Sequence, residues 1–399
     1  DYMNLVAQMV LDSFYRPFTE TAHELGALSR AQCAGSPTDL ISSYASVDIP
    51  ETEAMLYNPD FSRIVASSAA LSNKKIISAE TFTCLYGWPR DHMFEENIYD
   101  LKLVADALFA NGTNQIIWHG TPYNPIGIDT IFFYATVHVG KYGALTPYLK
   151  SFNNYLKKVS HFMRKGETYT NLAIYLPLED SWIAGEYPDS LQMPWSWGAY
   201  ELRYLNLPEG TRGYQPLWIN HEFLESGTVV NKELIVNGKS YSGLYVDVDY
   251  MNFKSIKTIY KHASNGWPVY FHQKPLQAGK NNEPEYEIMA DNLIKLSHSD
   301  LLNDIKPLIE GETIPEYWAR MDNDTLYVFF SNPGAWNLKY PIRFGQALEA
   351  TQDMIKIKLN WKGSVIPVEL SFEQNQSVLL KSDGQETHLI DIVYTASDK

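Results

Sequence analysis

The first 165 residues alternate between short apolar runs and longer segments with helical periodicity. Apolar positions spaced by three and four residues predict helices, and short apolar runs predict buried strands. The expected helices cover about 1–25, 37–45, 61–74, 99–112 and 145–166. The expected strands cover about 27–33, 46–50, 75–79 and 114–118. This alternation is typical of βαβ units around a parallel sheet.

The number of strands limits which α/β fold this region can complete. A (β/α)₈ barrel needs eight strands, each followed by a helix. The first region supplies four, so residues 1–167 are predicted to form the second half of such a barrel.

Two further regions show different patterns. Residues 168–312 start afresh with "YTNLAIYLPLEDSW" and again alternate strand and helix, which predicts a small doubly wound, flavodoxin-like α/β domain. Residues 313–399 contain short alternating runs such as "DTLYVFFSNP" and "VIPVELSF", separated by Gly, Asn, Pro and Asp. That pattern predicts a C-terminal β-sandwich.

Polar side chains gather at the predicted strand ends of the first region. In a barrel, the chemistry lies at the carboxyl ends of the strands. Glu80 ends the apolar run "KIISAETF", although a carboxylate is rarely fully buried unless it is paired. Taken in order, the polar residues at these ends are Arg30 and Gln32, then Asp48, Glu51 and Glu53, then Glu80, then His119.

These residue types suit several kinds of chemistry. Two facing carboxylates can hydrolyse a glycoside, one protonating the leaving oxygen and the other attacking the sugar or activating water. Glu80 with Glu51 or Glu53 would supply such a pair, and a separation of about 5–5.5 Å would indicate retention against about 6.5–9.5 Å for inversion. The same acids could instead hold calcium or be structural. His119 is either a sugar contact or a packed core histidine.

Composition and charge narrow the classes of ligand. The formal net charge is −15, which argues against nucleic acid or an anionic membrane as a partner. Aromatic residues make up 14% of the chain, and Trp88 and Trp118 are candidate stacking platforms for a sugar. No zinc-type Cys/His spacing, Gly-rich phosphate loop or transmembrane run is present in the sequence.

The two cysteines and the first ten residues lead to expectations about a disulfide and about processing of the chain. Cys33 and Cys84 leave open one disulfide or two buried thiols, of which the thiols are favoured. No signal peptide is visible, and "DYMNLVAQMV" reads as the middle of a helix. A fragment or a processed product is therefore expected, and the compartment is undetermined from the residues.

Three blocks of sequence resemble a known enzyme family. "RAQCAGSPTDLISSYASVDIPETE", "ASSAALSNKKIISAETFT" and "DLKLVADALFANGTNQIIWHGTPYNP" are similar to the alpha-L-rhamnosidases of glycoside hydrolase family 106. The resemblance covers residues 1–180 well and continues loosely to about 275. It implies an inverting, calcium-assisted hydrolase acting on terminal alpha-L-rhamnose, in an extracellular or periplasmic location.

The resemblance also implies roles for individual residues. Glu80 would be the general base, and Glu51 and Glu53 would line the site, with Glu53 as the metal ligand. The implied substrate contacts are Arg30, Gln32, His119, Trp118 and Trp88.

The first four barrel strands, and any general acid that they carry, are not in this chain. Either an N-terminal polypeptide completes the barrel, or the chain is an inactive fragment. The alternatives are another (β/α)₈ glycosidase, such as a beta-galactosidase, or a non-catalytic carbohydrate-binding fragment.

Overall fold

The computed structural model describes most of the 399 residues, and they form two compact units. The described residues are 1–54, 56–87, 92, 94–121, 137–140, 143–184, 202, 205–280, 283–349 and 352–396. Unit 1 comprises 1–50, 63–75 and 170–308, and unit 2 comprises 51–62, 76–169 and 309–399. Two of the crossings, after Tyr169 and after Leu308, fall close to the predicted domain boundaries after 167 and 312. The division into three domains stays a prediction.

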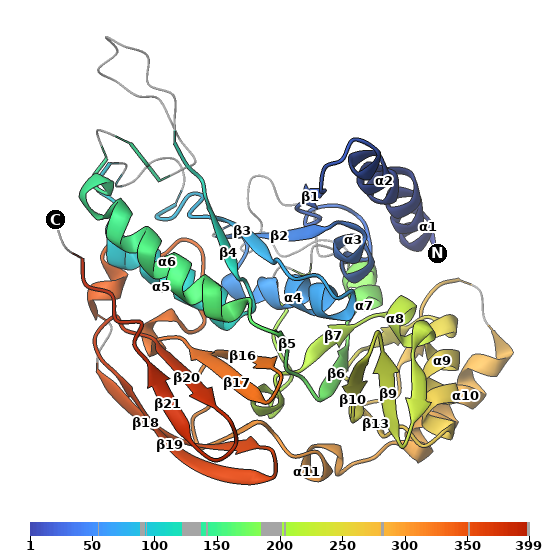
Figure 1. The fold of residues 1–399 in the computed structure, drawn as a ribbon. Coiled ribbons are helices and arrows are strands. Elements are labelled where there is room, and N and C mark those ends of the chain that lie inside the picture. Colours follow the sequence, from blue (N-terminus) through green and yellow to red (C-terminus); the bar gives the residue numbers. More distant parts are fainter. Residues whose placement is uncertain are drawn as a thin grey trace. The chain divides into compact units, whose positions relative to one another are not determined.

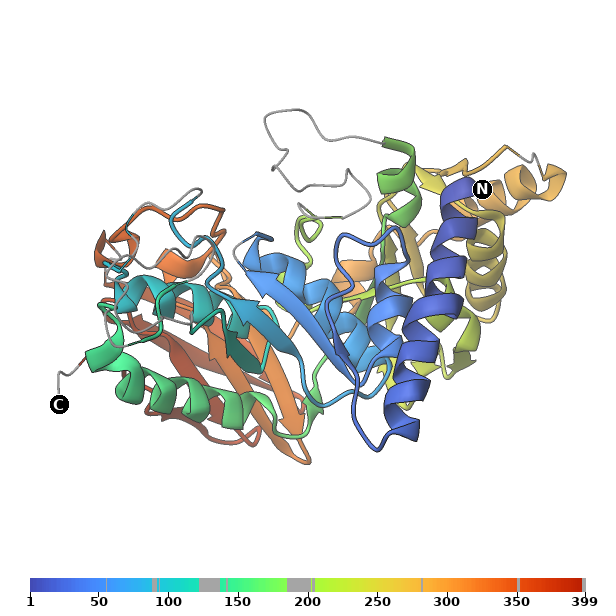
Figure 2. The same cartoon turned by 90° about the horizontal axis from the view of Figure 1, so that it is seen from above.

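Unit 1 begins with a long helical run that matches the predicted first helix. It consists of α1 (Tyr2–Val10), a π-helical turn (Leu11–Tyr15) and α2 (Arg16–Glu24). Figure 2 shows these pieces as one rod. The short strand β1 (Arg30–Ala31), α3 (Leu40–Ser46) and most of α4 (Ser62–Leu71) follow in the same unit.

A parallel four-stranded sheet forms the centre of the later part of unit 1. Its order is β13-β11-β6-β7, from β6 (Leu172–Tyr175), β7 (Leu217–Ile219), β11 (Gly243–Val246) and β13 (Val269–Phe271). Numbered along the chain, this order is 2-1-3-4 from the β7 edge, which is the order of flavodoxin-like sheets. The side chains of β6 and β11 are buried throughout, as expected of strands covered on both faces.

Helices and smaller strands complete unit 1. The helices are α7 (Leu178–Ala184), α8 (His221–Ser226), α9 (Phe253–Ser264), α10 (Pro284–Leu296) and α11 (Leu301–Asp304). The strands are β8 (Thr228–Val230), β9 (Glu233–Val236), β10 (Lys239–Tyr241), β12 (Tyr250–Met251) and β14 (Leu276–Gln277). In Figure 1, α9 and α10 run beside the strands of this unit.

Unit 2 contains the strands that carry the predicted site. They are the last four residues of β2 (Ile49–Ala54), then β3 (Ser78–Thr81) and β4 (Gln115–Trp118), all parallel. The first two residues of β2 pair with β1 within unit 1. All four strands predicted in the first region are therefore present, with bounds shifted by a few residues. A closed barrel is not formed by the described residues, and the half-barrel stays a prediction.

Helices α5 (Ile98–Ala110) and α6 (Leu149–Met163) pack on the β-rich part of unit 2. The rings of Phe109 and Phe329 lie 5.7 Å apart, and those of Phe162 and Tyr327 lie 5.8 Å apart. Helix α6 buries Phe152, Tyr155, Leu156, Val159 and Met163, whose spacing of three and four residues forms one apolar face. Helix α5 is buried on every side except at Tyr99, including its charged residues Asp100, Lys102 and Asp106.

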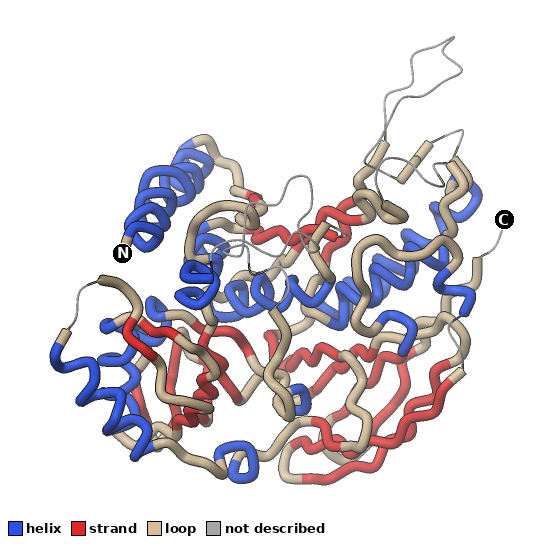
Figure 3. The backbone as a smooth tube through the Cα atoms, turned by 180° about the vertical axis from the view of Figure 1, so that it is seen from behind, coloured by secondary structure: helices blue, strands red, loops and turns tan. Residues whose placement is uncertain are grey.

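The β-rich tail forms two antiparallel sheets. One has the order β21-β20-β17-β16-β5, and the other has the order β15-β18-β19. Figure 3 shows β18 and β19 as a long hairpin. The predicted strands are thus present, and the face-to-face sandwich stays a prediction. The strands are β5 (Glu167–Thr168), β15 (Ile309–Glu310), β16 (Tyr317–Asp322), β17 (Thr325–Phe330), β18 (Asp353–Trp361), β19 (Ser364–Phe372), β20 (Val378–Ser382) and β21 (Thr387–Ile390).

Two further expectations concern the whole chain. Cys33 and Cys84 are both buried free thiols, so the favoured alternative is confirmed. Within the described ranges, no helix has the length and apolar character needed to cross a membrane.

Candidate functional site

One face of the parallel strands in unit 2 is lined by polar side chains. Successive side chains of a strand point to opposite faces. Glu51 pairs in register with Ser78, and Glu53 pairs in register with Glu80. Glu51, Glu53, Ser78 and Glu80 therefore share one face, and Thr52, Ala54, Ala79 and Thr81 share the other. The acids predicted to follow the strands lie within them instead, where the strand geometry fixes their direction.

Glu80 contacts a histidine and a threonine through a single carboxylate oxygen. Its Oε1 lies 2.9 Å from His119 Nδ1 and accepts a hydrogen bond from the Thr83 hydroxyl at 3.3 Å. Thr83 Oγ1 is also 2.9 Å from His119 Nδ1. The side chains of Glu80 and His119 are 31% and 33% exposed, so both are open to a small molecule. The structure thus brings Glu80 and His119 together, and the role of each stays a prediction.

The loop after β3 holds Thr83 in place. The backbone N–H groups of Phe82 and Thr83 both donate to the carbonyl oxygen of Ala54, at 2.7 and 3.3 Å. Phe82 and Cys84 have φ angles of 81° and 50°, in the left-handed region that non-glycine residues seldom occupy. Phe82 is fully buried, and its ring lies 5.0 Å from that of Trp118. Such backbone strain persists where surrounding contacts enforce it, and it is frequent at functional sites.

Glu51 and Glu53 are more buried than Glu80. Their exposed fractions are 8% and 4%. Glu51 Oε2 accepts a hydrogen bond from Ser78 Oγ at 2.8 Å, and Glu53 Oε2 accepts one from the backbone N–H of Tyr57 at 3.2 Å. Parallel strands lie about 4.8 Å apart, so Glu53 and Glu80 start from neighbouring backbone positions. Glu80 is the more accessible carboxylate of the three.

Glu53 also affects the groups around it. Burial, and then the negative charge of Glu53, raise the pKa of the Cys84 thiol to about 11. Burial, together with Cys84 and Glu53, raises the pKa of Tyr340 to about 12. Both groups are therefore neutral at ordinary pH, and Cys84 is a poor nucleophile because only a thiolate reacts readily.

Of the two tryptophans predicted to contact a sugar, the structure describes Trp118. Trp118 alternates with His119 and lies on the face opposite to Glu80, where its Nε1 donates to Asn153 of α6 at 3.0 Å. Its ring meets Phe152 edge-on at 5.7 Å. These contacts favour a packing role for Trp118. Trp88 lies outside the described residues.

Three other residues of the predicted set belong to unit 1. Arg30 pairs with Ile49 in β1, and Gln32 follows that strand. Their part in a site with Glu80 stays a prediction. Asp48 was expected at a carboxyl strand end, but it precedes β2 and accepts from the backbone N–H of Ser29 at 2.8 Å. It is a structural acid at the amino end of that strand.

The predicted calcium site would need a cluster of oxygen donors. Calcium requires six to eight oxygen ligands. Among the described residues, no group of three or more Asp, Glu, His or Cys side chains is placed to share a metal ion. Calcium therefore stays a prediction and has no part in the mechanism below.

Thr83 was not singled out from the sequence. Its hydroxyl completes the contacts of Glu80 and His119, yet nothing distinguishes it from the other threonines in the chain. The signal that could have found it is its position three residues after a strand acid, at the carboxyl end of β3.

Comparisons with known proteins place this fold among glycosidases. No known family model matches the chain. Over 180 residues it is 21% identical to a protein from Formosa agariphila described as a "Putative beta-glucuronidase", which is 44% of this chain and 15% of that protein. The chain thus spans a small part of that relative's length.

Two solved structures have similar folds. A rhamnosidase from Novosphingobium sp. PP1Y superposes with a TM-score of 0.72 at 13% identity, over 100% of this chain and 40% of that one. A beta-galactosidase from Bacillus circulans sp. alkalophilus superposes with a TM-score of 0.53 at 9% identity, over 94% of this chain and 67% of that one. At these identities the likeness establishes a shared fold.

Proposed function

We propose that the chain carries the second half of the catalytic barrel of a glycoside hydrolase that cleaves terminal alpha-L-rhamnosyl linkages. The observation that carries the proposal is the constellation of Glu80, His119 and Thr83 on adjacent parallel strands and their following loop. The sequence resemblance and the fold shared with a rhamnosidase support the substrate class.

Glu80 is the general base of the proposed reaction. A hydrogen bond donated to a carboxylate favours its charged form, and Thr83 donates one to Oε1. When His119 carries its proton on Nδ1, it donates a second one to the same oxygen. The other oxygen, Oε2, then accepts a proton from water while the water oxygen bonds to the anomeric carbon. This step inverts the configuration of that carbon.

The leaving oxygen needs a proton from a second carboxyl group on the opposite side of the sugar. Glu53 is unsuited to that role, because it neighbours Glu80 on the same face of the sheet and is buried. In this proposal the general acid is supplied by an N-terminal polypeptide that carries the other barrel strands. In agreement, no strand in the described part of the chain pairs with the outer edge of β4.

The first test is the native mass of the protein as isolated. The chain alone has a mass of 45.6 kDa, so a larger chain or a second polypeptide would reveal the complement. A native mass of the chain alone, without hydrolysis of an aryl alpha-L-rhamnoside, would contradict catalysis by this chain and favour the carbohydrate-binding alternative.

Glu80→Gln in the complete enzyme tests the role of the carboxylate. Removing a general acid or base lowers the rate by about 10²–10⁴-fold, so kcat on an aryl alpha-L-rhamnoside should fall by that factor. The matched control is Glu369→Gln, at an exposed position of β19 in the same unit, and it should leave kcat unchanged. Full activity of Glu80→Gln would contradict the assignment.

A beta-galactosidase is the second candidate, because a structure of that class also shares the fold. The same enzyme is assayed on an aryl beta-D-galactoside. Faster hydrolysis of the galactoside than of the rhamnoside would replace the substrate proposed here.

A further inference from the structure

A pocket of about 360 Å³ lies in unit 1 at the carboxyl ends of its parallel strands. Tyr175 ends β6, Asn220 follows β7, and Asn252 precedes α9 after β11, and all three line the pocket. In open α/β sheets, ligands bind where the strand order reverses. With the order 2-1-3-4, that point lies between β6 and β11, so the pocket occupies the position where such sheets bind ligands.

One side of the pocket is built around Asp39. Its Oδ1 accepts from the backbone N–H of Ser42 at 3.2 Å, and its Oδ2 accepts from Asn220 Nδ2 at 2.8 Å. Asn220 Nδ2 also donates to Ser42 Oγ at 2.8 Å, and Asn220 Oδ1 accepts from the backbone N–H of Phe223. These bonds lock the Asp39 carboxyl in place while each of its oxygens keeps a lone pair for a ligand.

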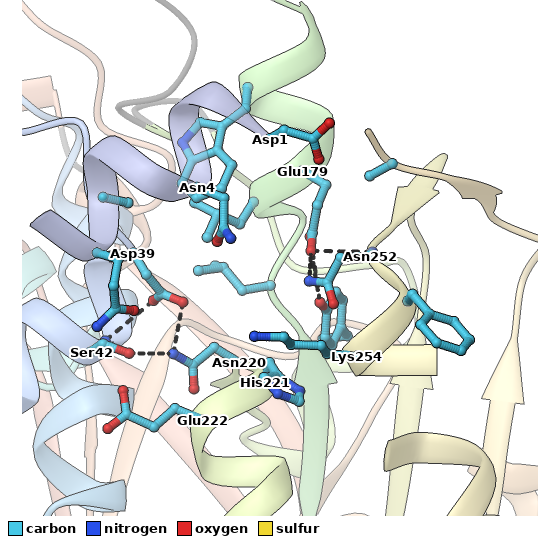
Figure 4. A pocket seen from close by; sticks show the side chains of 18 of the residues that line it. Asp1, Asn4, Asp39, Ser42, Glu179, Asn220, His221, Glu222, Asn252 and Lys254 are labelled. Carbon is cyan, nitrogen blue, oxygen red and sulfur yellow. Dashed lines mark hydrogen bonds between the residues drawn. The ribbon is translucent and has the colours of Figure 1, made fainter. Parts of the chain in front are cut away.

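The other side is built around Glu179, as Figure 4 shows. Glu179 Oε1 accepts from the side-chain amide and the backbone N–H of Asn252. Oε2 accepts a long hydrogen bond from the Tyr175 hydroxyl at 3.4 Å, and that hydroxyl has a better acceptor in Ser255 Oγ at 2.8 Å. Glu179 is 7% exposed. Its Oε2 is thus a buried acceptor whose hydrogen bond from Tyr175 is long, and a ligand hydroxyl could donate a shorter one.

The charge of the lining restricts the ligand. Burial raises the pKa of Asp39 to about 6 and that of Glu179 to about 7, and the neighbouring donors lower both values only in part. These carboxyls are accordingly close to neutral in mildly acidic solution. The connection from β6 to α7 is only Leu176 and Pro177, without glycine, and the first turn of α7 carries the two acids Glu179 and Asp180, so this turn cannot hold a phosphate as a Gly-rich loop does.

Metal binding is also disfavoured. In the part of the chain that the structure describes, no three acidic, histidine or cysteine side chains are placed around a common ion. What the pocket offers is a mixed set of donors and acceptors, with the amides of Asn220 and Asn252, charged groups of both signs such as Lys254 and Glu222, and the ring of Trp182 in its lining. Alternating donors and acceptors of this kind match hydroxyl groups, and the volume is at the lower end of the range for small-molecule sites.

We propose that this pocket of unit 1 binds one neutral sugar ring, without catalysing a reaction, through Asp39, Glu179, Asn220 and Asn252. This is a second site, formed by other residues than the Glu80 site of unit 2.

The test is calorimetric titration of the protein with L-rhamnose, D-galactose and D-glucose up to tens of millimolar. Asn4 lies on α1, is exposed, and lines the pocket, so Asn4→Trp places a large ring in its mouth. The matched control is Leu5→Trp at the next position, which is 61% exposed and outside the lining. Asn4→Trp should weaken binding at least about tenfold, equal to about 1.4 kcal/mol, and Leu5→Trp should not.

Other outcomes separate this proposal from the proposed function. Binding that persists in Asn4→Trp and is lost in Glu80→Gln would place the sugar in unit 2 and overturn the pocket proposal while supporting the other one. The absence of saturable binding by any of the three sugars would overturn it as well, as would binding of inorganic phosphate or calcium in their place. If circular dichroism shows that Asn4→Trp is unfolded, Ala278→Phe is used in its place, because Ala278 also lines the pocket.

Discussion

Buried carboxylates are stabilised in different ways in the two units. In unit 2, Asp106 faces the ammonium group of Lys102 at 2.6 Å, and their side chains are 2% and 1% exposed. In unit 1, the partly buried Asp39 and the buried Glu179 accept hydrogen bonds from amide groups of Ser42, Asn220 and Asn252. A cation favours the charged form of a carboxylate, whereas neutral donors only partly offset the cost of burial. The Asp106–Lys102 ion pair suits a buried core, whereas the amide-bound carboxyl groups of Asp39 and Glu179 keep acceptors for a ligand.

The largest expected effect on stability comes from removing Asp106 from its ion pair with Lys102. Asp106→Ala leaves Lys102 buried without its partner and removes the acceptor of Tyr155 at 2.5 Å and Ser377 at 2.6 Å. Removing one member of a buried ion pair costs about 3–5 kcal/mol. The free energy of unfolding in urea should fall by that amount.

The control for this prediction is Asp12→Ala, which removes the exposed partner of Arg16 in α2. Exposed ion pairs contribute little, so no measurable change is expected. A double variant, Lys102→Met with Asp106→Leu, should recover much of the loss because it buries no charge. Equal unfolding of Asp106→Ala and the parent protein would show that the pair is not needed.

The burial of Glu179 among neutral donors predicts that the stability of the protein depends on pH. The pKa of Glu179 rises from 4.5 in the unfolded chain to about 7 in the folded protein. Between these values the folded protein retains a proton that the unfolded chain has released, so the free energy of unfolding falls as pH rises. The expected loss from Glu179 alone is about 3 kcal/mol, from the rise of about 2.5 pKa units at 1.36 kcal/mol per unit.

Glu179→Gln sharpens this prediction. The amide does not titrate, so the dependence on pH across this window should shrink by the contribution of Glu179. Urea unfolding of the parent protein and the variant at both ends of the window measures it. An identical slope in both proteins would rule out Glu179 as its source.

The smallest expected effect compares one helix cap from each unit. Asn97 caps α5 by accepting from the backbone N–H of Tyr99 at 2.9 Å, and Asn252 caps α9 by accepting from Ser255 at 2.8 Å. Each change to Ala should cost about 1 kcal/mol for the lost cap. Asn252→Ala also removes a donor to Glu179, so it should cost about 1 kcal/mol more. Equal costs in urea unfolding would show that the amide contributes nothing to holding Glu179.

Local sequence patterns predicted most of the elements. The four strands of the first region and the helices between them are present because their periodicity agrees with the burial that the fold imposes. Glu80 and Glu53 were expected after their strands, but they lie inside β3 and β2. Short apolar runs end where polar residues begin, so a strand that continues into a polar site looks shorter than it is.

Other features depended on long-range contacts. No local pattern indicates that β5, at Glu167–Thr168, pairs with β16 in the tail of the chain. The left-handed backbone at Phe82 and Cys84, which positions Thr83, arises from tertiary contacts at residues that seldom adopt it.

The pocket of unit 1 was not predicted either. Its signals were present as Asn220 and Asn252, each directly before a helix and close after a parallel strand. Asp39, by contrast, reaches this pocket from a segment more than a hundred residues away in the sequence.

The interleaving of the two units has a consequence for synthesis on the ribosome. The chain passes between the units after residues 50, 62, 75, 169 and 308. Unit 1 is incomplete until residue 308 has emerged from the ribosome. By then residues 51–62 and 76–169 of unit 2 have been synthesised, but residues 309–399, which supply most strands of its two antiparallel sheets, have not. Nascent chains of this kind expose apolar surface for longer than chains whose domains follow one another. We therefore expect this protein to depend on chaperones during translation more than its size alone would suggest.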